Sequence, residues 1–383
     1  MLKKSYWAGK RRMRRNNINH VLRHYLLEML ELYQVDDSQG IDGYCQVLKG
    51  LLYSALDFLP GNFSRENVEI ELNQKLLRES VRQSSSSMPW MRIWDGKAKI
   101  FGYIDILEPG TTKNEINAYS IIDLNKRVFP NLILTNFFEF WYYRAEQNVC
   151  TVRPFSVSHL AGRTNKVKVT ITKLFLKGLQ HFMSYNEKKS KDSSFINLLQ
   201  RLALKAYYLR EYVLFPVMNH LIVSGSKCEL IRIYRAYCYF FDLELSIREF
   251  SAFLAHVIID GFLRAGIFHN RFNFNNENFF SRIRVKEFAE LTRMQDRRLA
   301  LFKFLSSGEN QLPVVVKWML DDISWLISGF DFNQVVFDSK EPWLIEGDML
   351  QWQDYFFKPF YDNPGYNERV IYLLAKEGII CSA

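Results

Sequence analysis

The chain has 383 residues, of which 48% are hydrophobic and 15% aromatic, so it can bury a sizeable core divided over two domains. Its richest apolar stretches, 121–134 and 250–268, are interrupted by charged residues, and no secretory signal is recognisable, so we expect no membrane span and a cytoplasmic protein. The five cysteines include no C-x-x-C pair, which excludes the common zinc and redox motifs.

Most of the net charge of +9 lies in residues 1–27, which contain no acidic residue. A basic arm over residues 1–17 suits phosphate contacts, because each lysine or arginine displaces condensed counterions from DNA. The residues expected to bind DNA are Lys10, Arg11, Arg12, Arg14 and Arg15. The alternatives are a solvated tail, or a misjudged start codon before a domain that begins near Ile18.

The first part of the chain mixes helical and strand patterns. In chain order the predicted elements are helices at 18–33 and 44–59, strands at 68–72, 88–94 and 100–107, a helix at 115–127, and strands at 130–135 and 137–143. The second and third strands form a hairpin that turns at Asp95 and Gly96. This order predicts one central sheet with flanking helices.

Beyond residue 164 the strand signal disappears and only helical patterns follow. The predicted helices span 169–184, 195–223, 229–241, 247–267, 285–305 and 313–327. We therefore predict an α+β chain with an N-terminal domain at 18–160 and an all-α domain at 161–383.

Several motifs of the first domain resemble type IIG restriction-modification enzymes. Met88-Pro89-Trp90 and the later run from Gly102 to Gly110 are similar to P-D-F and G-Y-I-E-A-K-D-P-G of their PD-(D/E)xK nuclease domain. The run from Phe129 to Asn136 is similar to P-N-L-I-L-T, and the run from Glu139 to Arg144 to E-F-x-x-Y-R. The resemblance implies a restriction-endonuclease-like α/β/α domain.

This chain differs from the family at the positions of the family's catalytic residues. Trp90 stands where the resemblance places the metal-binding aspartate, Asp105 at the second acidic position, and Leu107 at the catalytic lysine. Asp42 resembles the family's first-helix acid, and no glutamine stands clearly at its usual place after the hairpin. Because carboxylates hold Mg²⁺ and the lysine orients the attacking water, we expect a vestigial site over Asp42, Trp90, Asp105, Leu107 and Glu108, with no bound metal.

One alternative keeps catalysis in a rearranged site. Asp42, Asp105 and Glu108 would hold Mg²⁺, and Lys113 or Lys126 would replace the missing lysine. Asp95, Lys97 and Lys99 are expected at the hairpin turn, too far away to take part. The generic alternative is that Asp105 and Glu108 only cap and solvate a strand end.

The helical part resembles the connector that follows the nuclease domain in the same family. The run from Phe250 to Ala265 is similar to F-A-x-x-x-A-Q-T-I-A-Y-G-L-F-x-A, and the run from Trp318 to Ile323 to W-x-x-D-D-L. Trp318, Ile323 and Leu326 are expected in the core rather than at a cofactor. The methyltransferase motifs G-V-Y-Y-T-P and N-P-P-Y are not found, so no S-adenosylmethionine site is expected, and 363–366 only mimics the second motif.

Three functions follow from this resemblance. The favoured one is a DNA-associated, catalytically inactive remnant of a type IIG protein, truncated before the methyltransferase domain. The second is an active metal-dependent endonuclease with a rearranged site. The third is a subunit that docks on a separately encoded DNA adenine methyltransferase. A decaying gene whose product has no role is the generic alternative.

Overall fold

The computed structural model describes residues 18–34, 40–61, 63, 66–73, 89–96, 99–107, 109, 111, 120–154, 169–185, 195–225, 229–241, 244–271 and 314–332. Contacts between Cα atoms divide the chain into two compact units, residues 1–96 with 101–185 and residues 97–100 with 186–383. The first unit holds a six-stranded sheet with helices, and the described elements after residue 186 are helical. The predicted α+β class is confirmed.

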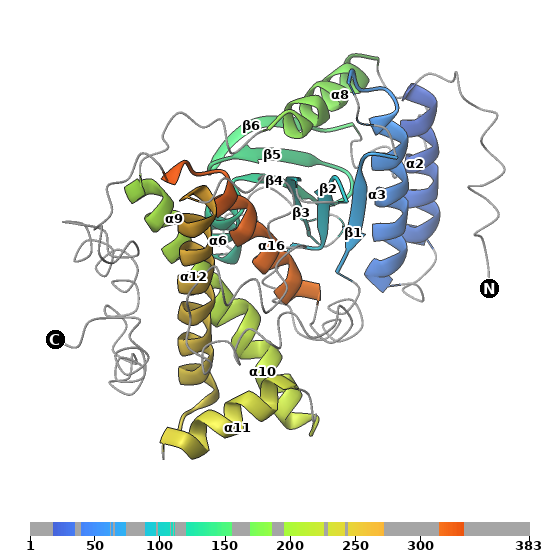
Figure 1. Cartoon of the computed structure of the whole chain (residues 1–383). Helices are drawn as coiled ribbons and strands as arrows, with labels where there is room; N and C mark the ends of the chain where they lie inside the picture. The colour runs from blue at the N-terminus through green and yellow to red at the C-terminus, as the bar shows by residue number, and fades with distance from the viewer. Residues whose placement is uncertain are drawn as a thin grey trace. The chain divides into compact units, whose positions relative to one another are not determined.

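The first unit follows the predicted order of helices and strands, with one strand added (Figure 1). Its elements are α2 (Ile18–Gln34), α3 (Gly40–Leu56), β1 (Glu69–Leu72), β2 (Met91–Trp94), β3 (Ile100–Ile106), α6 (Ser120–Val128), β4 (Asn131–Thr135), β5 (Phe140–Arg144), β6 (Gln147–Val152) and α8 (Val169–Met183). The added strand is β6. Its first three residues, 147–149, are all exposed, so it lacks the alternation that predicts a strand.

The sheet has the strand order β1-β2-β3-β4-β5-β6. β1 is antiparallel to β2, β4 to β5 and β5 to β6, whereas β3 is parallel to β4, with Tyr103 opposite Leu132. A parallel pair needs a crossover connection, and α6 lies in the segment that joins these two strands. The carboxyl ends of β3 and β4 therefore meet at one edge of the sheet.

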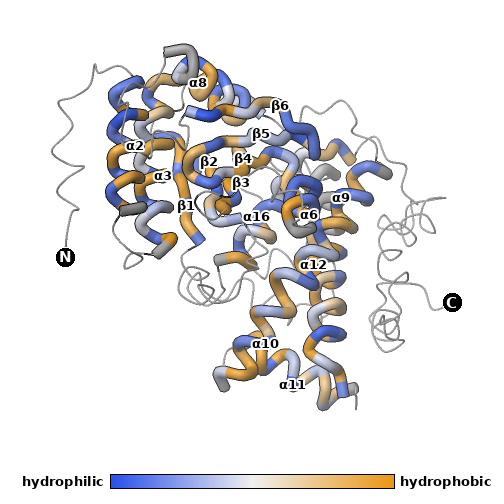
Figure 2. The backbone as a smooth tube through the Cα atoms, turned by 180° about the vertical axis from the view of Figure 1, so that it is seen from behind, coloured by the Kyte–Doolittle hydropathy of each residue, from blue (hydrophilic) through white to orange (hydrophobic). Residues whose placement is uncertain are grey.

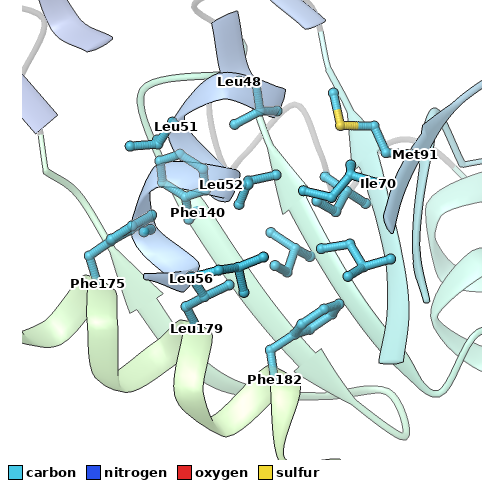
Figure 3. Close-up of a cluster of buried hydrophobic side chains, with 14 of the residues drawn as sticks. Leu48, Leu51, Leu52, Leu56, Ile70, Met91, Phe140, Phe175, Leu179 and Phe182 are labelled. Atoms are coloured by element: carbon cyan, nitrogen blue, oxygen red, sulfur yellow. The ribbon is translucent and has the colours of Figure 1, made fainter. Parts of the chain in front are cut away.

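The main core of this unit lies between one face of the sheet and the helices α2, α3 and α8. Figure 3 shows leucines of α3 and aromatic side chains of α8 converging on β1 and β5. In Figure 2 both hydrophilic (blue) and hydrophobic (orange) residues occur along α2 and α3, as expected for amphipathic helices. Ile104 and Ile106 belong to this core, whereas Tyr103 and Asp105 contact the α6 segment. Side chains alternate along a strand, so α6 covers the opposite face.

Helix α8 belongs to the first unit. Its Phe182 lies so close to Gly102 that an added Cβ there would meet the ring at 2.6 Å and the Asn131 carbonyl oxygen at 2.5 Å. Asn131 also donates from its side chain to the Phe101 carbonyl and, at 3.0 Å, to the Phe182 carbonyl. Because of this packing, the first unit ends at residue 185, later than the predicted division at 160/161.

The described elements of the second unit are helices that match the predicted ones. They are α9 (Phe195–Tyr208), a π-helical turn η3 (Leu209–Leu214), α10 (Phe215–Val223), α11 (Glu229–Phe241), α12 (Ile247–Arg271) and α16 (Val314–Ser328). Trp318, Ile323 and Leu326 are core residues, as predicted. The predicted helix 285–305 lies outside the described residues. Within the described part of the chain, no helix has the length and apolarity needed to cross a membrane.

Candidate functional site

The candidate site is the sheet edge where β3 and β4 end. Asp105 is the penultimate residue of β3, and Leu107 directly follows the strand. Trp90 directly precedes β2, the neighbour of β3, and its carbonyl accepts a hydrogen bond of 3.0 Å from the Asn73 N–H. A short turn joins β2 to β3, so the two strands run antiparallel. Trp90, just before β2, therefore lies near the end of β3 that contains Asp105. Three positions of the predicted site thus meet at one edge.

Asp105 is a buried carboxyl held by neutral donors. Its residue is 6% exposed; one oxygen accepts from the Asn125 side-chain amide at 2.9 Å and the other from the Ile106 N–H at 3.0 Å. Burial raises the pKa of Asp105 to about 7, although both hydrogen bonds act in the opposite direction. Near neutral pH this group is therefore partly protonated when no cation lies beside it.

Trp90 and Leu107 are held by packing and backbone bonds. Trp90 is half-buried and packs against the main hydrophobic core. The Leu107 N–H donates to the Thr135 carbonyl at 2.8 Å, which extends the β3–β4 pairing by one residue. An indole and an isobutyl group supply neither a charged ligand to Mg²⁺ nor a cation to a developing phosphorane. The residues at this edge do not fit a magnesium-dependent nuclease.

The remaining residues of the predicted site do not complete it in the part of the chain that is described. Asp42 is exposed in the first turn of α3, and Glu108 lies outside the described residues, as does Lys113. No three histidine, cysteine, aspartate or glutamate side chains among the described residues gather closely enough to hold a metal ion.

The candidate replacement lysine on α6 has other contacts. The Lys126 ammonium lies 2.9 Å from an Asp123 oxygen and 4.6 Å from the centre of the Tyr143 ring. Asp95 and Lys99 lie at the β2–β3 turn, at the other end of β3 from Asp105, as predicted.

The family-like residues on β4 and β5 have structural roles. The Thr135 hydroxyl donates to the Glu139 carbonyl at 2.7 Å and accepts from the Phe137 N–H at 3.0 Å. The Asn136 side chain accepts from the N–H groups of Phe138 and Glu139 and donates to the Thr111 carbonyl at 2.8 Å. These bonds fix the β4–β5 connection, in which Phe137 adopts a φ of 71°. The Thr135 and Asn136 side chains are therefore used to hold this connection in place.

Sequence reasoning did not single out Asn125, the main partner of Asp105. One signal was present, because Ile122, Asn125 and Val128 share the buried face of α6, and a polar residue on such a face needs a partner. Asn73, fully buried beside Trp90, was missed as well. Its side-chain amide has no hydrogen-bond partner among the residues that the structure describes.

The basic arm, with Lys10, Arg11, Arg12, Arg14 and Arg15, lies outside the described residues. Its predicted contact with DNA therefore stays a prediction.

Comparisons with solved structures give a distant likeness. No family model and no curated protein matches the sequence. A solved structure titled as a cryo-electron microscopy structure of a DrdV–DNA complex is similar at 10% sequence identity with a TM-score of 0.29. The match covers 90% of this chain and 29% of that chain. The chain therefore spans less than a third of the length of the protein it matches.

Proposed function

We propose that this chain is a DNA-associated, catalytically inactive remnant of a type IIG restriction-modification enzyme, with a nuclease-like first unit and a helical connector. The observation that carries the proposal is the environment of Asp105. A carboxyl at the metal-binding position of the sheet is buried against the Asn125 amide, and burial raises its pKa to about 7. Mg²⁺ is held by oxygen ligands that usually include more than one carboxylate, and Trp90 stands where the resemblance places the second one.

Loss of cleavage follows from the types of residue at the edge. A metal-dependent nuclease uses its metal to polarise the phosphoryl group and a base or lysine to orient the attacking water. Trp90 and Leu107 provide neither. Each missing group costs about two to three powers of ten in rate, so we expect no cleavage above background.

DNA association rests on the basic N-terminal arm and on the family resemblance. The test is electrophoretic retardation of a duplex DNA by the full chain at increasing salt, with and without residues 1–15. We expect retardation that weakens steeply with salt and is reduced by the deletion, because phosphate contacts release counterions. Absent or salt-independent retardation would contradict DNA association.

Inactivity is tested separately with supercoiled plasmid and Mg²⁺ or Mn²⁺. We expect the plasmid to remain intact after long incubation, in the wild type and in Asp105→Asn alike. Cleavage that disappears in Asp105→Asn would instead support the endonuclease with a rearranged site.

A second candidate function is favoured by an exposed aromatic pair on the second unit. Tyr239 and Phe240 at the end of α11 are 85% and 73% exposed, and their rings lie 6.1 Å apart. Exposed aromatic groups of this size often mark protein interfaces. They fit a chain that docks on a separately encoded methyltransferase. Co-purification with the product of an adjacent gene, lost in Tyr239→Ser/Phe240→Ser, would support this function.

A further inference from the structure

Helix α8 presents two lysines and a histidine on its outer face. Its sequence, Val169–Met183, contains no acidic residue. Phe175, Leu179, Phe182 and Met183 are buried in the main core, whereas Lys173, Lys177 and His181 are exposed. These three exposed residues follow one another at intervals of four, so they lie along one side of the helix, about 6 Å apart along its axis.

Arg144, the last residue of β5, adds a cation to the two lysines, at the carboxyl end of α8. Its guanidinium donates to the His181 carbonyl at 3.0 Å and lies 5.1 Å from the centre of the Tyr185 ring. Burial lowers the pKa of His181, and the charges of Arg144 and Lys177 lower it further. The positive groups are therefore close enough to repel an additional charge.

Carboxylates do not offset these cations in the described part of the chain. Lys173 and Lys177 form no ion pair there, and the neighbouring strand β6 contains no acidic residue. Two acids that precede α8 in the chain have basic partners, since Glu146 lies 3.7 Å from Arg127 and Glu139 lies 3.1 Å from Arg153. Like charges held together in this way attract an anionic partner.

We propose that Arg144, Lys173, Lys177 and His181 form a surface that contacts the phosphate backbone of duplex DNA. We call it the α8 cationic row. The inference rests on the proposed DNA association and gives that association a location in the folded unit, separate from the basic arm. The contacts carry no base recognition, because point charges on a helix face bind phosphates rather than base edges. Binding through this row should therefore not depend on DNA sequence.

The test is fluorescence anisotropy of the full chain with a labelled 30-base-pair duplex over a salt series. Lys173→Gln/Lys177→Gln removes two charges from exposed positions, so folding should be unaffected. The matched control, Arg232→Gln/Arg235→Gln, removes two charges from exposed positions of α11. Lys173→Arg/Lys177→Arg keeps the charge of the row and should bind as the wild type does.

We expect the glutamine variant of α8 to bind about tenfold more weakly or worse near 0.1 M salt. The slope of log K against log salt should fall by about 1.8 in magnitude, because about 0.9 counterion is released per phosphate contact. The α11 control should keep the wild-type slope.

Two outcomes would overturn the inference. If the wild type binds DNA and the α8 variant keeps the full slope, or loses no more than the α11 control, the row is not a DNA contact although DNA association stands. If the wild type does not bind DNA even at low salt, the proposed function fails together with the inference.

Discussion

Both units of the chain bury aspartate side chains, and Asp322 in the second unit is held differently from Asp105 in the first. In the second unit Asp322 on α16 forms a buried ion pair with Lys205 on α9, whose residues are 3% and 2% exposed. In the first unit Asp105 has a neutral amide from Asn125 as its side-chain partner. Burial lowers the pKa of Lys205 while Asp322 acts in the opposite direction, and burial raises the pKa of Asp105.

The difference shows what the sheet edge lacks. A buried carboxylate stays ionised when a cation compensates for its lost hydration, and otherwise takes up a proton. The helical unit supplies that cation from its own sequence. In a metal-dependent nuclease the compensating cations at the sheet edge would be a lysine and a magnesium ion held by a second acid. This chain has Trp90 at the position of that acid and Leu107 at the position of the lysine.

The largest expected effect comes from breaking the compensated pair. Lys205→Met leaves the Asp322 carboxylate buried without its cation and should lower the free energy of unfolding of the second unit by about 3 to 5 kcal/mol. Lys205→Met/Asp322→Leu removes both charges and should recover most of the loss. Urea denaturation followed by circular dichroism measures both. Equal losses in the single and double variants would show that the pair is not the source.

The next effect is a pH dependence caused by Asp105. Its pKa is about 7 in the folded chain against an ordinary value of 3.8, so both states are protonated below about pH 4. Between pH 4 and 7 the carboxyl ionises in the unfolded chain but not in the folded chain, which favours unfolding. Above pH 7 it is ionised in both states, and the loss of stability no longer grows. Stability contributed by this group is thus lost as pH rises, by about 2 to 4 kcal/mol.

Asp105→Asn should remove this part of the pH dependence, measured by urea denaturation of the first unit from pH 4 to 8. The matched control is Asp123→Asn, whose side chain on α6 is 69% exposed. The control should keep the wild-type profile. A profile that is unchanged in Asp105→Asn would mean that Asp105 is already ionised at low pH.

A smaller effect is expected from the amide that holds Asp105. Asn125→Leu keeps the branched shape of the side chain but removes the donor, leaving Asp105 with the Ile106 N–H. We expect a loss of about 1 to 3 kcal/mol at pH 8, where the carboxyl is charged. The loss should shrink at pH 5, where the carboxyl is protonated. A loss that does not vary with pH would indicate packing rather than hydrogen bonding.

The smallest expected effect is a shift in the pKa of Asp105 when a cation is placed beside it, as Lys205 lies beside Asp322. Leu107→Lys places an ammonium two residues along the same edge, and side chains two apart point to the same face of a strand. The pKa of Asp105 should fall by about one unit, worth about 1.4 kcal/mol. Titration of the Asp105 carboxyl carbon by NMR measures the shift. An unchanged pKa would mean that position 107 does not face the carboxyl.

The parts of the fold with strong local patterns could be predicted from the sequence. The amphipathic period placed α2 and α11, and the apolar run at 100–107 placed β3. β6 lacks such a pattern because its first residues are exposed. The six residues of the π turn η3 include no glycine or proline that would mark a break, so the run from 195 to 223 reads as one helix. The placement of α8 depends on contacts at Gly102 that no local pattern encodes.

The site could be predicted only as positions along the chain. The motif order places Trp90, Asp105 and Leu107 at the ends of neighbouring strands, because strand order fixes where strands end. The partner of Asp105 depends on which face α6 turns toward the sheet, and Asn125 shows this only once the sheet is formed. The α8 cationic row was missed for a related reason, since Arg144 and His181 meet only in the folded unit.

Calorimetric titration of the full chain with Mn²⁺, with Asp105→Asn as the control, tests the central claim most directly. We expect no stoichiometric binding in either protein up to millimolar metal. Binding of one Mn²⁺ per wild-type chain that disappears in Asp105→Asn would contradict the account, because the sheet edge would then still hold a metal.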